Sequence, residues 1–172
     1  GEIVVSAKLF LDIVRRLPEE IVMIETDDRM VTYITCGHVD YQIVGMSSVE
    51  YPDLPSFEQT DGITVNSKIL REMIRQTVYA VSENTAKPIY TGSLFEIENG
   101  NFRIVAVDGY RMAIRNETVD SESKTSFVVP GKTQQEVLKL LTDDEENVEI
   151  IIGQRHITFK VRNYRVISRL IE

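Results

Sequence analysis

The fold of this chain is decided by the stretch Ile63-Thr64-Val65-Asn66-Ser67-Lys68, which has two counterparts elsewhere in the sequence. The counterparts are Ile3-Val4-Val5-Ser6-Ala7-Lys8 and Phe127-Val128-Val129-Pro130-Gly131-Lys132. Each stretch begins with apolar residues typical of a strand and leads into an amphipathic run typical of a helix. The three final lysines are 60 and 64 residues apart, which indicates a repeated structural module.

The charges of the three predicted helices recur in place. Each helix has a basic residue, an acid four residues later and a second basic residue seven residues after the first: Lys8, Asp12 and Arg15; Lys68, Glu72 and Arg75; Lys132, Glu136 and Lys139. Positions seven apart share a helix face, so each copy presents a basic stripe. Two interpretations stay open: a repeated binding surface, or surface ion pairs worth about 0.2–0.5 kcal/mol each.

Apolar residues occupy the other side of each predicted helix. We expect this side to pack on a core while the charged side faces solvent or a partner. The apolar positions are Phe10, Ile13, Val14 and Leu17 in the first helix, Leu70, Met73 and Ile74 in the second, and Val137, Leu138 and Leu141 in the third.

Short strands follow each helix, with polar turns between them. The Asn99-Gly100 pair between alternating segments favours a hairpin. The sequence therefore predicts an α+β fold of three βαβββ repeats. The strands predicted after the helices are 21–24, 30–34 and 41–44, then 93–97, 102–107 and 110–114, then 148–151, 156–161 and 164–167.

Two repeats would make one domain, so the repeats imply a partial domain followed by a complete one. The segment Tyr51-Pro52-Asp53-Leu54-Pro55-Ser56-Phe57, with two prolines, marks the boundary. We expect residues 1–55 to be the second half of a domain, 56–61 a linker and 62–172 a complete domain. The polar stretch from Asn116 to Ser126 is predicted to be an exposed loop.

Composition bounds the class of protein. The chain has 172 residues, 42% of them hydrophobic, no apolar run long enough for a membrane span, and no recognisable signal peptide. With a single cysteine, Cys36, it fits a reducing compartment, and we expect a cytoplasmic location. A net charge of −8 argues against indiscriminate coating of nucleic acid but leaves room for a local basic track.

Candidates for catalysis are weak. The acidic runs Asp27-Asp28 and Asp143-Asp144-Glu145-Glu146 fall in predicted turns and are interpreted as solvated loops. His38 and His156 have no metal-ligand spacing, and Gly131-Lys132-Thr133 lacks the first glycine of a phosphate loop because Ser126 stands there. We expect no enzyme activity, no metal and no cofactor.

Three segments of the chain, one of them already quoted, resemble a known family. They are Ser47-Ser48-Val49-Glu50-Tyr51-Pro52-Asp53-Leu54-Pro55, Val105-Ala106-Val107-Asp108-Gly109-Tyr110-Arg111-Met112-Ala113 and the third copy of the opening stretch, 127–132. Together they closely resemble the bacterial DNA sliding clamps, the beta subunits of the replicative DNA polymerase III. That resemblance implies the DNA-clamp (processivity) fold and a homodimeric ring around duplex DNA. It also implies that residues 1–55 are the C-terminal half of clamp domain 1, that 62–172 is domain 2, and that domain 3 is absent.

The resemblance also implies two sites. One is a set of basic residues that contact duplex DNA without reading sequence: Lys8, Arg15, Lys68, Arg71, Arg75, Lys132 and Lys139. The other is an apolar cleft for short peptides of the polymerase, the clamp loader and repair proteins, with Tyr90, Val107, Gly109, Tyr110, Arg111 and Met112. The bland interpretation of the second set is a hairpin turn beside a core methionine.

Two other functions remain open: a peptide-binding adaptor domain with the same fold, and, more distantly, a nucleotide-processing enzyme. Because a half domain leaves strand edges open, the sequence also predicts either local disorder in residues 1–50 or pairing between chains.

Overall fold

A computed structural model describes residues 1–18, 21–52, 62–144 and 146–172. The chain divides into two compact units, Gly1–Ser56 and Phe57–Glu172, which are called here the first and second unit. The linker predicted at 56–61 lies outside the described residues. Among the helices in the described ranges, none is long and apolar enough to pass through a lipid bilayer.

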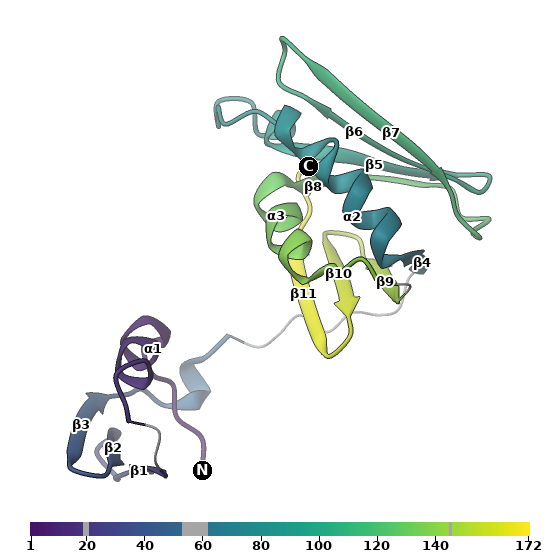
Figure 1. The fold of residues 1–172 in the computed structure, drawn as a ribbon. Helices are drawn as coiled ribbons and strands as arrows, with labels where there is room; N and C mark the ends of the chain where they lie inside the picture. Colours follow the sequence, from purple (N-terminus) through teal and green to yellow (C-terminus); the bar gives the residue numbers. More distant parts are fainter. Residues whose placement is uncertain (19–20, 53–61, 145) are drawn as a thin grey trace. The chain divides into compact units, whose positions relative to one another are not determined.

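The described part of the first unit consists of an α-helix, a small sheet and a short 3-10 helix (Figure 1). Helix α1 (Ala7–Val14) is followed by a three-stranded antiparallel sheet in the order β1-β2-β3 and a short 3-10 helix, η1 (Ser48–Glu50). The strands are β1 (Val22–Thr26), β2 (Val31–Cys36) and β3 (Val39–Val44). Among its described residues, Ile13, Ile34 and Ile43 form a small buried cluster, against which Val5, Phe10, Leu17 and Tyr41 pack.

The prediction of a strand at the start of the first unit is wrong. The segment 3–8 contributes only an isolated bridge, from Val4 to Met46, before α1 begins at Ala7. In the second unit the equivalent segments are true strands because each lies beside a hairpin strand of the other repeat. The first unit contains only one repeat and offers no such neighbour.

The second unit contains two complete repeats. The second repeat is β4-α2-β5-β6-β7 and the third is β8-α3-β9-β10-β11, with two 3-10 helices between α2 and β5. The bounds are β4 (Gly62–Asn66), α2 (Ser67–Arg75), η2 (Val78–Ala80), η3 (Pro88–Thr91), β5 (Gly92–Glu98), β6 (Asn101–Val107), β7 (Met112–Thr118), β8 (Thr125–Pro130), α3 (Gly131–Leu140), β9 (Asn147–Ile152), β10 (His156–Val161) and β11 (Tyr164–Arg169).

Each sheet of the second unit takes one strand from the other repeat. The strand orders are β11-β10-β9-β4 and β7-β6-β5-β8, so β4 and β8, the first strands of their repeats, are exchanged. Ile63 of β4 lies opposite Ile150 of β9, and Phe127 of β8 lies opposite Phe95 of β5. The two repeats are therefore interlocked and fold as one body.

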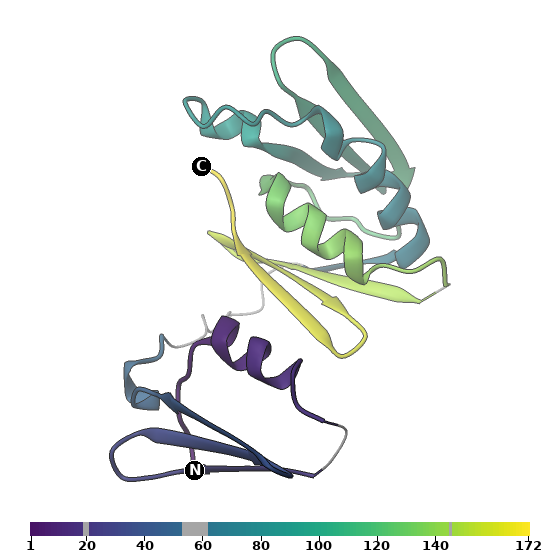
Figure 2. The same cartoon turned by 60° about the vertical axis from the view of Figure 1, so that its left-hand side comes forward.

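One continuous core joins both sheets and both helices of this unit. Leu70, Met73 and Ile74 of α2 and Val137 of α3 are completely buried in it, which confirms their predicted core-facing side. Phe95 is at its centre, with its ring 5.6 Å from that of Phe102. Figures 1 and 2 show α2 and α3 side by side.

Two predicted boundaries need correction. The strand expected at 110–114 begins at Met112, because Asp108 holds Tyr110 and Arg111 in the preceding turn. The loop expected from Asn116 to Ser126 is shorter, because β7 continues to Thr118 and β8 begins at Thr125. Pairing with neighbouring strands extends both elements into polar sequence.

Candidate functional site

The first lysine of every repeat lies at the same point of its helix. Ser6, Asn66 and Pro130 are the N-cap residues, and the lysine follows two positions later in each case. In α2 the side chain of Asn66 accepts hydrogen bonds from the backbone N–H groups of Lys68 (3.0 Å) and Ile69 (3.3 Å). Side-chain caps thus fix where α1 and α2 start, whereas Pro130 makes no such hydrogen bond in α3.

Lysine is an unfavourable choice at this position. The N-terminal end of a helix carries a partial positive charge, which disfavours a cation there by about 0.3–1 kcal/mol. No acidic residue stands in the first turn of any of the three helices, and Lys8, Lys68 and Lys132 are all exposed. The stability of the helix dipole therefore does not account for a lysine at this position.

The second basic residue of each repeat lies at the other end of its helix. Arg15 is the C-cap of α1, Arg75 ends α2, and Lys139 is in the last turn of α3. A cation is favoured there by the helix dipole, so these positions have a structural explanation of their own.

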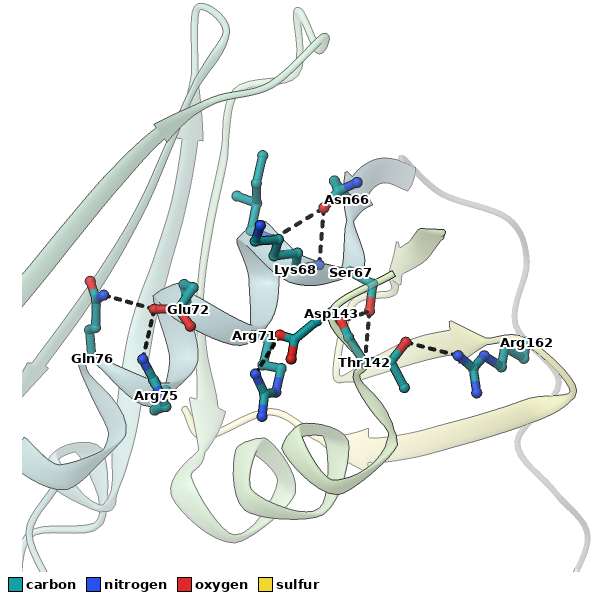
Figure 3. A network of polar contacts seen from close by, with 11 residues as sticks. Asn66, Ser67, Lys68, Arg71, Glu72, Arg75, Gln76, Thr142, Asp143 and Arg162 are labelled. Atoms are coloured by element: carbon teal, nitrogen blue, oxygen red, sulfur yellow. Dashed lines mark hydrogen bonds and ion pairs between the residues drawn. The ribbon is translucent and has the colours of Figure 1, made fainter. Parts of the chain in front are cut away.

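In α2 and α3 the acid of the repeat pairs with the C-terminal cation. Glu72 accepts from Arg75 at 3.1 Å and from Gln76 at 3.0 Å, and Glu136 accepts from Lys139 at 2.7 Å (Figure 3 shows the first group). No ion pair joins Lys68 or Lys132 to any residue within the described ranges. Lys68 and Lys132, in the first turns, therefore lack the intramolecular ion pairs that Arg75 and Lys139 make.

Arg71 differs from the other predicted basic residues. It is half-buried and donates to Asp143, which follows α3, over 2.6 Å (Figure 3). Beside it, the hydroxyl of Ser67 at the start of α2 exchanges hydrogen bonds of 3.2 Å with the backbone of Thr142. Arg71 thus holds the beginning of α2 to the end of α3.

The two helices run in opposite directions. The start of α2 lies at the end of α3 through Ser67 and Thr142, and the start of α3 lies near Val81, beyond α2, where a Cβ on Gly131 would meet the Val81 side chain at 2.9 Å. Lys68 and Lys132 therefore stand at opposite ends of the helix pair. Within the second unit the predicted basic residues form one group on α2 and α3. Lys8 and Arg15 belong to the first unit.

The predicted peptide cleft centres on the turn between β6 and β7. Asp108 accepts from the backbone N–H groups of Tyr110 (3.0 Å) and Arg111 (3.1 Å) and from the Nε of Arg111 (2.8 Å). The hydrogen bond from Tyr110, with those from Arg111, lowers the pKa of the Asp108 carboxyl below its usual value. Gly109, with φ of 95°, lies in the region that favours glycine and makes this turn possible.

A hollow of about 570 Å³ opens beside this turn. Tyr110 and Arg111 line it, and the guanidinium of Arg111 lies 5.7 Å from the ring centre of Tyr79. The other lining residues come from the segment after α2, from the turn and from α3: Val78, Tyr79, Val81, Ser82, Glu83, Asn84, Asp108 and Gln135. No spacing in the sequence links 78–84 to 108–111, so this wall was not predicted.

Four predicted cleft residues lie outside the lining of this hollow. Met112 is 61% exposed at the start of β7, and Val107 ends β6. Tyr90 is in η3, and its carbonyl accepts from the N–H of Ser82, which does line the hollow. Gly109, in the turn itself, is the fourth, whereas Tyr110 lines the hollow and is fully exposed. Tyr110 and Met112, two positions apart in the chain, thus both expose apolar surface at this turn.

The acidic runs have partners within the protein. Asp27 accepts from the N–H groups of Arg29 and Val31 and shapes the turn before β2. Asp144 and Glu146 pair with Arg162. Among the described residues there is no group of three potential ligands that would hold a metal ion.

Two sequence models of known families match the chain. The model described as "DNA polymerase III beta subunit, central domain" matches residues 64–172, and "DNA polymerase III beta subunit, N-terminal domain" matches residues 1–55. The first match alone covers more than half of the chain.

Similar proteins point in the same direction. The chain is 38% identical to a protein of Halalkalibacterium halodurans and 36% identical to one of Bacillus subtilis, both named "Beta sliding clamp". Each match covers 100% of this chain and 46% of the relative, so the chain spans about half the length of the curated relatives it matches.

Solved structures share the fold. A putative DNA polymerase III beta subunit from Eubacterium rectale superposes with a TM-score of 0.91 at 39% identity, over 100% of this chain and 48% of that one. The DNA polymerase sliding clamp of Bacillus subtilis gives a TM-score of 0.93 at 35% identity, over 100% of this chain and 46% of that one. The predicted α+β clamp fold is thereby confirmed.

Proposed function

Because the chain belongs to the DNA polymerase III beta subunit family, we propose that it is part of a bacterial DNA sliding clamp, a processivity factor that tethers the replicative polymerase to duplex DNA. The three helices that each carry an exposed lysine in their first turn support this proposal. In this assignment residues 1–55 are the C-terminal half of clamp domain 1, 56–61 a linker and 62–172 domain 2. The first half of domain 1 and domain 3 would belong to the full-length protein, which would close as a homodimeric ring in the cytoplasm.

The basic residues of α2 and α3 suit a contact that must slide. Lys68, Arg75, Lys132 and Lys139 are exposed, and phosphates attract cations regardless of base sequence. The ion pairs of Arg75 and Lys139 lie at the surface, where such pairs contribute about 0–1 kcal/mol. A phosphate would therefore displace Glu72 or Glu136 at little cost. Arg71, held by Asp143, is the least available of the set.

The turn after β6 suits a second role, the docking of short peptides. The hollow beside Tyr110 and Arg111 and the exposed Met112 combine a polar rim with adaptable apolar contacts. Tyrosine adds a broad ring with a polar tip. Through this surface the clamp would hold the polymerase, the clamp loader and repair proteins in turn. The protein itself would carry out no catalysis.

Retention on circular DNA tests the proposed function. The full-length protein, loaded on closed circular duplex DNA by its clamp loader, should remain bound through gel filtration and should be lost after the circle is linearised. An adaptor that binds peptides without encircling DNA would show no difference in retention between circular and linear DNA. That result would overturn the sliding-clamp assignment.

Charge reversal tests the residues. We expect Lys68→Glu with Lys132→Glu to weaken DNA binding and to make the salt dependence of binding less steep, because each lost phosphate contact removes counterion release. The matched control reverses the charges of Lys87 and Lys124, which lie outside the α-helices. Equal effects of the two double variants would contradict a DNA surface on α2 and α3.

A further inference from the structure

The turn between β10 and β11 holds an arginine in a backbone conformation that arginine rarely adopts. Val161 and Tyr164 are paired at the ends of the two strands, so Arg162 and Asn163 form a two-residue turn. Arg162 has φ of 52°, in the left-handed region, where glycine and asparagine are favoured. At the first position of the β5–β6 turn, where φ is 51°, the residue is Asn99. The backbone gives no reason for an arginine at position 162, which directs attention to its side chain.

The guanidinium of Arg162 makes three hydrogen bonds to the connection between α3 and β9. Its Nε donates to Glu146 over 2.5 Å, and its Nη2 donates to Asp144 and to the hydroxyl of Thr142, both over 2.8 Å. The planar fork of arginine suits such a multiple contact better than a lysine ammonium does. In Figure 3, Arg162 approaches Thr142 from the side opposite to Arg71. Two carboxylates are thereby neutralised and drawn toward the β10–β11 turn.

The same connection is bound to the first turns of α2. The carbonyl of Glu146 accepts from the backbone N–H of Ser67 over 2.7 Å, and the Ser67 hydroxyl exchanges hydrogen bonds with the backbone of Thr142. Between these contacts, Asp143 accepts from Arg71 over 2.6 Å. The path of this connection therefore sets where its acids lie relative to the basic residues of α2.

The basic residues of α2 share one face of the helix. Lys68, Arg71 and Arg75 are separated by three and then four positions, which places their side chains in one row. Asp144 directly follows the acid that contacts Arg71, and Glu146 is bonded to the residue before Lys68. Both acids are thus anchored beside this face, and charges interact over about 8–10 Å at physiological salt. Without a cationic partner, they would oppose the approach of a phosphate.

We propose that Arg162 is a positioning residue for the basic face of α2. By holding the carboxylates of Asp144 and Glu146 at the β10–β11 turn, it keeps them from Lys68 and Arg71, so a phosphate of duplex DNA meets a cationic surface. Arg162 itself makes no contact with the phosphate. The role rests on the proposed function, because it requires that α2 faces duplex DNA.

Equilibrium binding of the full-length protein to a fluorescent duplex oligonucleotide at low salt tests this role. Arg162→Gly should weaken binding about fivefold, because the two freed carboxylates act at the range of a surface charge interaction. Glycine accepts a positive φ without strain, so the turn should persist in this variant.

The matched control is Lys160→Gln, which removes the same charge from the same hairpin. Lys160 pairs with Glu149 over 2.9 Å. Its neighbours Phe159 and Val161 are buried in the core, so its side chain lies on the other face of the sheet. This variant should bind DNA as the wild type does.

Neutral acids provide a rescue that a merely structural role would not give. Adding Asp144→Asn and Glu146→Gln to Arg162→Gly should restore the wild-type affinity, because no carboxylate is left to be held away from α2. The two acid changes in the presence of Arg162 should leave the affinity unchanged, since Arg162 already neutralises both groups. This second comparison does not depend on the folding of Arg162→Gly.

The outcomes separate this role from the proposed function. If Lys68→Glu with Lys132→Glu leaves DNA binding intact, the DNA surface on α2 and α3 is itself wrong. If that pair weakens binding and Arg162→Gly does not, only the positioning role fails. Equal losses from Arg162→Gly and Lys160→Gln would reduce the effect to net charge. A loss that persists in the triple variant would make Arg162 a direct phosphate contact, and either result would overturn the positioning role.

Discussion

Arg111 donates from its Nε to the carboxylate of Asp108 over 2.8 Å, and its backbone N–H donates to the same carboxylate. One acid thus fixes both the backbone and the side chain of the residue that carries the positive charge at the proposed peptide site. The guanidinium, held in this way, lies 5.7 Å from the ring centre of Tyr79 and lines the hollow.

The first prediction concerns pH. Hydrogen bonds from Tyr110 and Arg111 lower the pKa of Asp108 in the folded protein, so the ionised carboxyl stabilises the turn at pH values above the unfolded pKa. That stabilisation is lost as the pH falls through the folded pKa. The Arg111 amide signal in NMR spectra should therefore titrate with a midpoint below 3.8. Asp108→Asn should abolish the transition, and a midpoint above 3.8 would contradict the geometry.

The second prediction concerns the exposed apolar pair beside that turn. Tyr110→Ala and Met112→Ala should each change the free energy of unfolding by less than about 0.5 kcal/mol, because both side chains are exposed. The same changes should lower affinity about tenfold for short peptides from bacterial replicative polymerases and clamp loaders, measured on a peptide array and then by calorimetry. Tyr164→Ala, a tyrosine of similar exposure to Met112 on β11, is the control. Unchanged peptide affinity would remove these residues from the site.

The third prediction concerns a buried polar link in the second unit. Gln134 is completely buried, donates to the carbonyl of Val129 over 2.8 Å and accepts from the hydroxyl of Ser93 over 3.1 Å. Gln134→Leu should destabilise the protein by about 1–3 kcal/mol, because both partners lose a hydrogen bond inside the core. Urea unfolding measures this. Gln135→Leu, at the exposed neighbouring position, should have little effect, and equal losses would refute the explanation.

The fourth prediction concerns sliding. Changing Asp12, Glu72 and Glu136 to glutamine in the full-length protein should slow its diffusion along DNA, because Arg75 and Lys139 lose the acids that compete with phosphate. Single-molecule tracking gives the diffusion coefficient. Glu98→Gln removes an ion pair on the β5–β6 hairpin and serves as the control. Unaltered diffusion of the triple variant would show that these acids do not regulate the DNA contact.

The helices and hairpins that could be predicted were those marked by patterns over a few consecutive residues. The 3.6-residue spacing of Leu70, Met73 and Ile74 identified the buried face of α2, and the Asn99-Gly100 pair identified the β5–β6 hairpin. Both signals depend on residues a few positions apart. The wall of the hollow formed by 78–84 carried no such signal, because it meets the Asp108 turn only after the chain has folded.

By itself, the sequence determined that this protein is built from one repeated module and that each module starts its helix with an exposed lysine, since periodicity and capping are properties of short segments. Only the tertiary structure decided that β4 and β8 change places between sheets, because the partner of a strand is chosen by packing with residues far along the chain. The same physical reason leaves Ile24 exposed in the first unit while Ile150, an identical residue in an equivalent strand, is completely buried.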